Sequence, residues 1–219
     1  GVEFVRADIR NPMIARVIES AGVDTVVHMN VIATPTFVGG RTPQKEINVI
    51  GTMQLLAACQ KSTTVRRLVV KSSAAVYGST PRDPAMFTED MGAKRSPSGG
   101  FGKDSIEVEG YVRALARPRP DTKILTLRSA NIVGPRIRTS ITDYFNLPVV
   151  PVPLGYDARM QFVHEDDAID ALVRATTGEA SGIVNIAGDG VLTVLQAAAI
   201  VGRPVVPMPL QAAGVVGGF

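Results

Sequence analysis

The feature of this sequence that most constrains its fold is the regular alternation of short extended runs with helical segments. Residues 2–7 read as an extended run, residues 12–22 as a helix that Gly22 ends, and residues 25–28 as a β-branched run. Short connections between such elements are typical of strand–helix–strand units, whose strands run parallel in one sheet. The beginning of the chain therefore predicts an α/β fold.

The same alternation continues along the chain. Residues 43–61 have the broad apolar face of a packed helix, and residues 67–71 form an almost continuous apolar run. Residues 102–116 resume a helix and residues 123–127 a strand, whereas residues 80–100 are rich in Pro, Gly, Ser and charge and read as a long loop. Apolar runs of this kind are typical of strands buried on both faces, which indicates a parallel sheet with helices on either side.

After Gly134 and Pro135 the pattern changes, so we place a boundary between residues 1–133 and 134–219. Prolines at positions 148, 151 and 153 interrupt the next apolar stretch, which indicates irregular or edge structure. Beyond it we expect a helix with an acidic start, a strand, and a helix capped by Thr193 and ended by Gly202, over residues 164–176, 182–187 and 193–201.

Composition and charge disfavour several classes of protein. The 219 residues are 45% hydrophobic and 20% charged, the balance of a globular chain. The net charge is only +3, the basic residues are scattered and aromatics make up 5%, so we expect no nucleic-acid partner. A lone Cys59 forms no intramolecular disulfide, no apolar run reaches roughly 18 residues, and no signal-peptide pattern is visible, so we expect a cytoplasmic protein without a membrane partner.

Seven separated segments carry a family resemblance. They are VRADIRNP from Val5, VVHMN from Val26, NVIGT from Asn48, SSAAVYG from Ser72, LRSANIVGPR from Leu127, QFVHEDD from Gln161 and VNIAG from Val184. In this order they resemble motifs of the extended short-chain dehydrogenases, the NAD-dependent nucleotide-sugar epimerases and dehydratases, and are most similar to actinobacterial UDP-glucose 4-epimerase-like proteins. The resemblance implies a Rossmann-type doubly wound parallel sheet in residues 1–133, without its first strand–helix–strand section, and a smaller, incomplete α/β substrate region in residues 134–219 that could be interleaved with the first.

The resemblance also implies a site, a cofactor and partners. Residues implied to contact NAD are Asp8, Ile9, His28, Met29, Asn30, Asn48, Ser72 and Asn131, and those implied to meet a UDP-glucose or UDP-galactose type of substrate are Ser73, Arg136 and Gln161. No metal site is implied. The glycine-rich phosphate loop that NAD requires would precede Gly1, since Gly100-x-Gly102 and Gly188-x-Gly190 fail its spacing. Members of the family often pair through two helices, which implies a homodimer through helices 43–61 and 102–117.

The chain departs from the family at the pair that transfers protons. In the family a tyrosine, whose pKa is lowered by a lysine one helical turn later, takes the proton of a substrate alcohol, and a serine at the position of Ser73 binds that alcohol. Phe101 and Ser105 occupy the usual Tyr and Lys positions, and none of the four tyrosines has a lysine at that spacing. Phenylalanine has no ionisable proton.

Two hypotheses about function remain open after this departure. The protein could act on a nucleotide sugar with NAD through an atypical active site, for which Lys103, Asp104 and Glu107 are the nearest ionisable groups. Alternatively, it is a catalytically silent family member that serves as a cofactor-binding, regulatory or interaction module.

Overall fold

The computed structural model describes residues 2–29, 32–33, 38–78, 80, 83–84, 86–97 and 100–209. The chain divides into two compact units, one made of Gly1–Arg128 and Asp170–Asn185, the other of Ser129–Ile169 and Ile186–Phe219. Each unit is described by itself.

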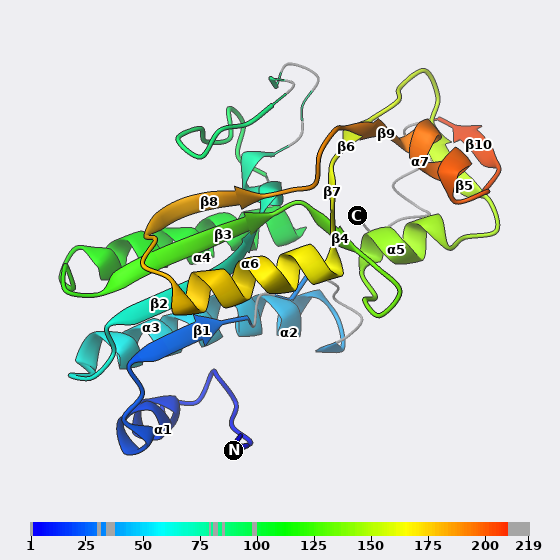
Figure 1. The fold of residues 1–219 in the computed structure, drawn as a ribbon. Coiled ribbons are helices and arrows are strands. Elements are labelled where there is room, and N and C mark those ends of the chain that lie inside the picture. Colours follow the sequence, from blue (N-terminus) through cyan, green and yellow to red (C-terminus); the bar gives the residue numbers. More distant parts are fainter. Residues whose placement is uncertain are drawn as a thin grey trace. The chain divides into compact units, whose positions relative to one another are not determined.

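The first unit is built on a four-stranded sheet of order β1-β2-β3-β8 (Figure 1). Its strands are β1 (Thr25–His28), β2 (Arg67–Ser73), β3 (Lys123–Ser129) and β8 (Gly182–Ile186). β1 and β2 pair in parallel, with Thr25 opposite Arg67 and His28 opposite Val70. The arrows of β1, β3 and β8 point the same way in Figure 1. The predicted parallel sheet of an α/β fold is confirmed.

Helices cover this sheet. They are α1 (Ile14–Ala21), α2 (Arg41–Lys45), the π-helical turn η2 (Glu46–Gly51), α3 (Thr52–Lys61), the 3₁₀ turn η3 (Ala74–Tyr77), α4 (Gly100–Ala116) and α6 (Glu165–Thr177). Leu55 of α3, Leu68 and Val70 of β2, and Val108 of α4 belong to one buried cluster. The predicted helices 43–61 and 102–116 are confirmed, and the former contains a π-helical turn that periodicity does not reveal.

One prediction for the first unit is wrong. Residues 2–7, expected as a strand, form no strand in the structure, and Val2 and Phe4 are exposed. A strand needs a neighbour with which to exchange backbone hydrogen bonds. The part of the chain that the structure describes provides no such neighbour for this segment.

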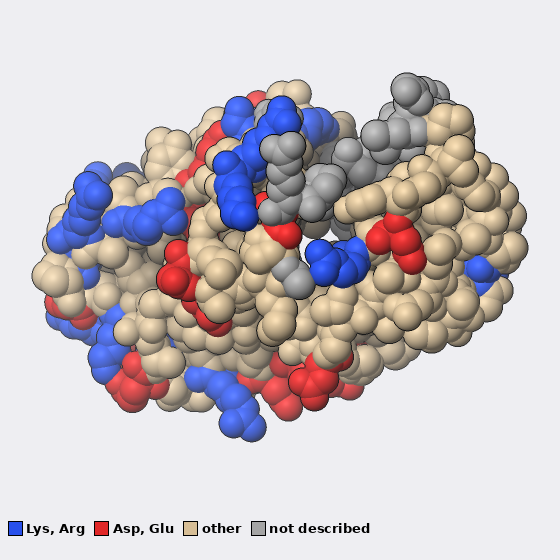
Figure 2. All heavy atoms as spheres, turned by 90° about the horizontal axis from the view of Figure 1, so that it is seen from above, with Lys and Arg blue, Asp and Glu red and all other residues tan. Residues whose placement is uncertain are grey.

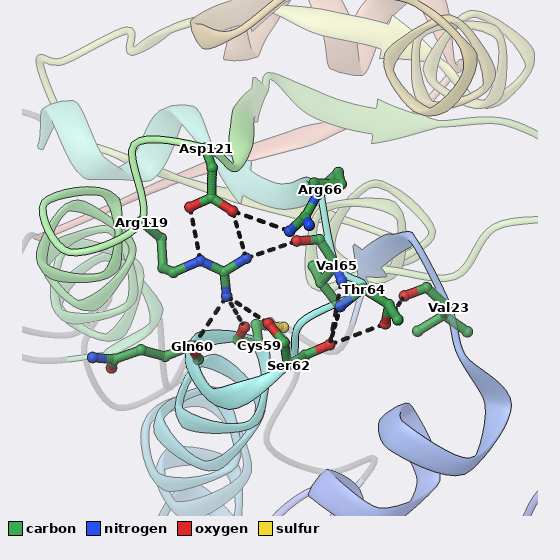
Figure 3. A network of polar contacts seen from close by, with 9 residues as sticks. All are labelled: Val23, Cys59, Gln60, Ser62, Thr64, Val65, Arg66, Arg119 and Asp121. Carbon is green, nitrogen blue, oxygen red and sulfur yellow. Dashed lines mark hydrogen bonds and ion pairs between the residues drawn. The ribbon is translucent and has the colours of Figure 1, made fainter.

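The guanidinium of Arg119 closes the carboxyl end of α3 (Figure 3). Its Nη1 donates to the carbonyl oxygens of Cys59, Gln60 and Ser62 at 2.7, 3.1 and 2.9 Å, and its Nη2 donates to that of Val65 at 2.8 Å. The last carbonyls of a helix have no partner within the helix, so a cation that donates to them satisfies them and opposes the negative end of the dipole. Arg119 thereby joins the loop before β3 to the loop before β2.

The described residues of the second unit form three small ladders and two whole helices, besides the start of α6. Its elements are β4 (Asn131–Val133), α5 (Ser140–Phe145), β5 (Val150–Pro153), β6 (Arg159–Met160), β7 (Phe162–His164), β9 (Leu192–Thr193), α7 (Val194–Ile200) and β10 (Val205–Met208). β5 pairs in parallel with β10 alone, so Pro151 and Pro153 lie in an edge strand, as predicted. Thr193 and Gln196 form a capping box at the start of α7, which confirms Thr193 as the cap.

Candidate functional site

The candidate site is the carboxyl end of β2, because ligands of open parallel sheets bind beyond the carboxyl ends of the strands. β1 ends at His28, opposite Val70, so the last three residues of β2, Lys71, Ser72 and Ser73, extend past β1. Successive strand side chains alternate between faces, which places Lys71 and Ser73 on one face and Ser72 on the other. Ser72 is buried and donates to Oε1 of Glu109 at 2.7 Å.

Ser73 is half-buried and begins the 3₁₀ turn η3. Its Oγ accepts a hydrogen bond from the backbone N–H of Ala75 at 3.2 Å. That bond fixes the position of the oxygen, while the hydroxyl proton has no acceptor within the part of the chain that the structure describes. Ser73 can therefore donate to a substrate oxygen, as the role expected from the sequence requires.

Lys71 is the residue at this strand end that the sequence analysis missed. Burial lowers the pKa of its ammonium, and its positive charge contributes to lowering the pKa of His28. Among the described residues no carboxylate lies within ion-pair distance of Lys71. A lysine inside the run Leu68-Val69-Val70 is the sequence signal that could have identified it.

Phe101 and Ser105 lie on α4 and interact within the protein. Phe101 packs against the buried cluster of the first unit. Ser105 is 1% exposed, and its hydroxyl donates to the carbonyl oxygen of Phe101 at 2.9 Å. Its hydroxyl proton is thus used inside the helix. Ser105 therefore replaces neither the positive charge nor the hydrogen-bond donor that a lysine would provide.

The three ionisable residues next to them differ in availability. Asp104 is fully buried and accepts two hydrogen bonds from the guanidinium of Arg41, at 2.5 and 2.6 Å. Lys103 is exposed, and Glu107 lies 3.9 Å from the ammonium of Lys45. Asp104 is therefore neutralised by Arg41 and shielded from ligands.

Asn48 holds the segment that follows β1. Its Oδ1 accepts from the N–H of Ile32 at 2.7 Å, and its Nδ2 donates to the carbonyl oxygen of Ile32 at 2.9 Å and to Asp104 at 3.3 Å. Gln44 donates to the same Ile32 carbonyl at 2.9 Å. Asn48 is fully buried and holds this segment in position. Its contact with the cofactor stays a prediction.

His28 is buried at the end of β1 and bonds to Thr52. The Thr52 hydroxyl donates to the carbonyl oxygen of Asn48 at 2.6 Å, so it can only accept from His28 Nε2, 2.7 Å away. Burial, helped by the charge of Lys71, lowers the pKa of His28 to about 4. His28 is therefore neutral at pH 7 and carries its proton on Nε2.

The remaining predicted cofactor residues of the first unit lie near its beginning. Asp8 is exposed and accepts from the backbone N–H and the guanidinium of Arg10, which lowers the pKa of its carboxyl to about 2. Ile9 approaches Gly51 so closely that a Cβ there would lie 2.5 Å from Cγ2 of Ile9. Met29 is exposed, and Asn30 lies outside the described residues.

In the second unit, the structure brings Asn131 and Gln161 together. Asn131 donates from Nδ2 to the carbonyl oxygen of Gln161 at 3.1 Å, and Gln161 donates to the carbonyl oxygen of Gly188 at 3.0 Å. Arg136 is exposed and pairs with Glu165 at 2.9 Å and with Asp166. The cofactor role of Asn131 and the substrate roles of Arg136 and Gln161 stay predictions.

A buried ion pair lies beneath the long loop. Glu109 accepts from Arg128 Nε at 3.0 Å and from Nη2 at 2.7 Å, and both side chains are almost fully buried. Burial alone would lower the pKa of Arg128, but hydrogen bonds to Glu109 and Tyr77 outweigh it and raise that pKa. A cavity of about 130 Å³, lined in part by Arg113 and Met91, borders this pair.

The glycine pairs do not form a phosphate-binding turn between a strand and a helix. Gly100 and Gly102 lie inside α4, and Gly188 and Gly190 lie between β8 and β9.

Within the described ranges no cluster of three metal-ligating side chains occurs, and none of the helices described is long and apolar enough to cross a membrane. Lys and Arg lie in separate groups on the face shown in Figure 2.

The sequence of the chain matches one protein family over most of its length. Residues 1–187 match the NAD dependent epimerase/dehydratase family. The chain belongs to this family. The resemblance that the sequence motifs indicated is thereby confirmed, although family membership alone does not assign roles to single residues.

Relatives of this epimerase/dehydratase-family chain include uncharacterized mycobacterial proteins. An uncharacterized protein of Mycobacterium tuberculosis is 52% identical over 207 residues, which cover 94% of this chain and 55% of that protein. The chain thus spans about half the length of the curated relatives that it matches first.

Solved structures confirm the Rossmann-like parallel sheet of the family. UDP-glucuronic acid 4-epimerase from Bacillus cereus, in complex with UDP-glucuronic acid and NAD, has a TM-score of 0.76 at 21% identity, covering 94% of this chain and 68% of its own. UDP-glucose 4-epimerase from Thermus thermophilus, in complex with NAD, has a TM-score of 0.74 at 25% identity, covering 95% and 72%.

Proposed function

We propose that this chain is part of an NAD-dependent protein that oxidises and reduces a nucleotide sugar of the UDP-glucose or UDP-galactose type without the usual Tyr/Lys pair. The observation that carries the proposal is the end of β2, where Ser73 and Lys71 extend past β1 on one face of a parallel sheet. Membership in the NAD dependent epimerase/dehydratase family supports it. Structural neighbours hold UDP-glucuronic acid with NAD, or NAD alone, which supports a nucleotide-sugar substrate and NAD as the cofactor.

The first unit offers polar groups that would suit the two ends of an NAD molecule. Asp8 offers an exposed carboxylate that could accept from the adenine amino group, and its low pKa keeps it charged above about pH 2. At the other end, Ser73 offers a hydroxyl and Lys71 an amine beyond β1. Bound there, the cofactor would supply the acceptor for the hydride of the sugar alcohol. The glycine-rich phosphate loop is the part that we expect upstream of Gly1.

In this arrangement the chain binds and orients the sugar alcohol. Ser73 would donate its hydroxyl proton in a hydrogen bond to the alcohol oxygen, since Ala75 holds that serine oxygen in place. Phe101, packed against the core, would leave the usual place of the tyrosine without a proton donor or acceptor.

The test uses the full-length protein. We expect calorimetry to detect NAD binding, and we expect UDP-glucose and UDP-galactose to interconvert. Absence of a binding heat at millimolar NAD would contradict the proposal. Replacement of Ser73 by Ala should reduce turnover and leave NAD affinity within about threefold, whereas Ser20→Ala, at an exposed position of α1, is the matched control.

A second candidate is a catalytically silent family member that binds NAD as a regulatory or interaction module. Two contacts favour it: the hydrogen bond of Ser105 to Phe101 and the ion pair of Asp104 with Arg41. Both use polar groups of α4 within the protein, so these groups are not available to a substrate. It predicts NAD binding with no turnover of UDP-glucose by the wild type, and a gain of turnover when Phe101→Tyr and Ser105→Lys are combined. Robust turnover by the wild type would rule it out.

We further propose that the protein is a homodimer that pairs through the helices at residues 43–61 and 102–117. Ile50 and Met53 support this, because both are large apolar side chains that remain about 45% and 44% exposed on that stretch. Light scattering on the full-length protein should give the mass of a dimer, and Ile50→Glu with Met53→Glu should give a monomer. A monomeric wild type at micromolar concentration would contradict the proposal.

A further inference from the structure

Lys71 combines three properties that an ordinary structural lysine lacks. It occupies a central strand, β2, whose residues from Arg67 to Val70 are all buried. Within the described part of the chain, no carboxylate pairs with it. It lies beyond the end of β1, at the edge where parallel sheets bind their ligands. A half-buried cation without a partner in the described part of the chain is unfavourable for stability, and such groups cluster at functional sites.

We propose that Lys71 is the proton-transfer residue of this site and that its amine, next to Ser73, exchanges the proton of the sugar alcohol. The inference rests on the proposed function and names the group that replaces the missing pair.

The geometry of the strand supports contact of both residues with one ligand. Lys71 and Ser73 are two positions apart on one face, about 7 Å along the strand. A lysine side chain has four methylene groups and can span that separation, so its amine can approach the oxygen that Ser73 binds. Burial lowers the pKa of Lys71, which increases the fraction of neutral amine able to accept a proton near pH 7.

The competing groups are less suited to this task. His28 is neutral, but its Nε2 proton is committed to Thr52 in the interior. Asp104 is fully buried against Arg41. Lys103 is exposed on α4, away from the end of β2 along the chain. Lys71 is therefore the best candidate: it lies two residues from Ser73, it is half-buried, and it has no charged partner among the described residues.

The proposed step balances as follows. The O–H bond of the sugar alcohol breaks, and its proton passes to the neutral amine of Lys71, which becomes an ammonium. The adjacent C–H bond breaks, and the hydrogen leaves with both bonding electrons to a nicotinamide-class oxidant, so that the alcohol is oxidised to a ketone and the oxidant is reduced. In the reverse direction the ammonium of Lys71 returns the proton to the oxygen as hydride returns to carbon.

A labelling experiment tests the position of Lys71 independently of turnover. The full-length protein is treated with a trace of acetic anhydride, alone and with NAD plus UDP-glucose, and the acetylation of each lysine is measured by mass spectrometry. We expect the ligands to protect Lys71 at least fivefold and to leave the exposed Lys61 on α3 unchanged. Equal labelling of Lys71 with and without the ligands would overturn the inference.

Variants then separate a proton carrier from a fixed charge. Lys71→Arg keeps the charge but does not lose its proton, and Lys71→Met keeps an unbranched stem of similar length in the strand. Both should reduce UDP-glucose turnover by about 100- to 10,000-fold with NAD affinity within about threefold of the wild type, while Lys61→Arg should match the wild type.

The possible failures are distinguishable. Full turnover by Lys71→Arg would overturn the proton-transfer role. A wild type that binds NAD but gives no turnover would also overturn it and would favour the silent module. A wild type that binds no NAD would contradict the proposed function itself, and this inference with it.

Discussion

Removal of the Glu109 charge should destabilise the protein strongly, because Glu109 is the counter-ion of a buried guanidinium. Arg128 is 6% exposed and Glu109 3%, and two hydrogen bonds of 2.7 and 3.0 Å join them. Ser72 adds a third bond to the carboxylate at 2.7 Å. Breaking a buried pair by removing one partner typically costs about 3 to 5 kcal/mol, so we expect Glu109→Gln to lower the free energy of unfolding by about that amount.

The assay is urea unfolding of the full-length protein, followed by the fluorescence of an environment-sensitive dye or by circular dichroism. Arg113→Gln is the matched control: Arg113 is exposed and lies 3.7 Å from Glu109, so its removal should cost less than about 1 kcal/mol. The double variant Glu109→Leu with Arg128→Met should recover part of the loss, because no buried charge remains unpaired. A loss below about 1 kcal/mol for Glu109→Gln would refute the reasoning.

Two further predictions concern stability and its dependence on pH. Arg119→Met should lower the free energy of unfolding by about 1 to 3 kcal/mol, since it leaves the carbonyl groups at the end of α3 without their donor; urea unfolding measures this, with the exposed Arg117→Met as control. His28 has a folded pKa of about 4, below the ordinary value of about 6.5, so the unfolded state binds more protons between those values and stability falls as pH decreases through them. From pH 7.5 to 5 the free energy of unfolding of the wild type should fall by about 2 kcal/mol more than that of His28→Gln. Equal decreases would contradict the conclusion that folded His28 is neutral.

The architecture could be predicted from the sequence because its signals are local. Buried strands such as β2 consist of apolar runs, and α7 begins at a threonine cap that its own sequence supplies. The segment at residues 2–7 misled the prediction because an apolar extended run becomes a strand only beside a partner, and its own sequence does not reveal whether one is present. The π-helical turn at Glu46–Gly51 could not be predicted, because hydrophobic periodicity does not distinguish one widened turn from the helix around it.

The candidate site was predictable in part. Sequence motifs located Ser73 and identified Phe101 and Ser105 as the departures from the family pattern. They did not reveal that Asp104 is committed to Arg41, because those residues are far apart in sequence and meet only in the folded chain. Nor did they identify Lys71, whose significance depends on the register of β2 against β1 and on the lack of a carboxylate nearby among the described residues.

The most direct test of the account is whether the full-length protein reduces bound NAD when UDP-glucose is added. Rapid mixing, followed by the near-ultraviolet absorbance of reduced nicotinamide, measures this in a single turnover. We expect a transient absorbance rise in the wild type, slowed by about 100-fold or more in Lys71→Met. A wild-type protein that binds both ligands and shows no rise, while the Phe101→Tyr, Ser105→Lys variant does, would contradict it.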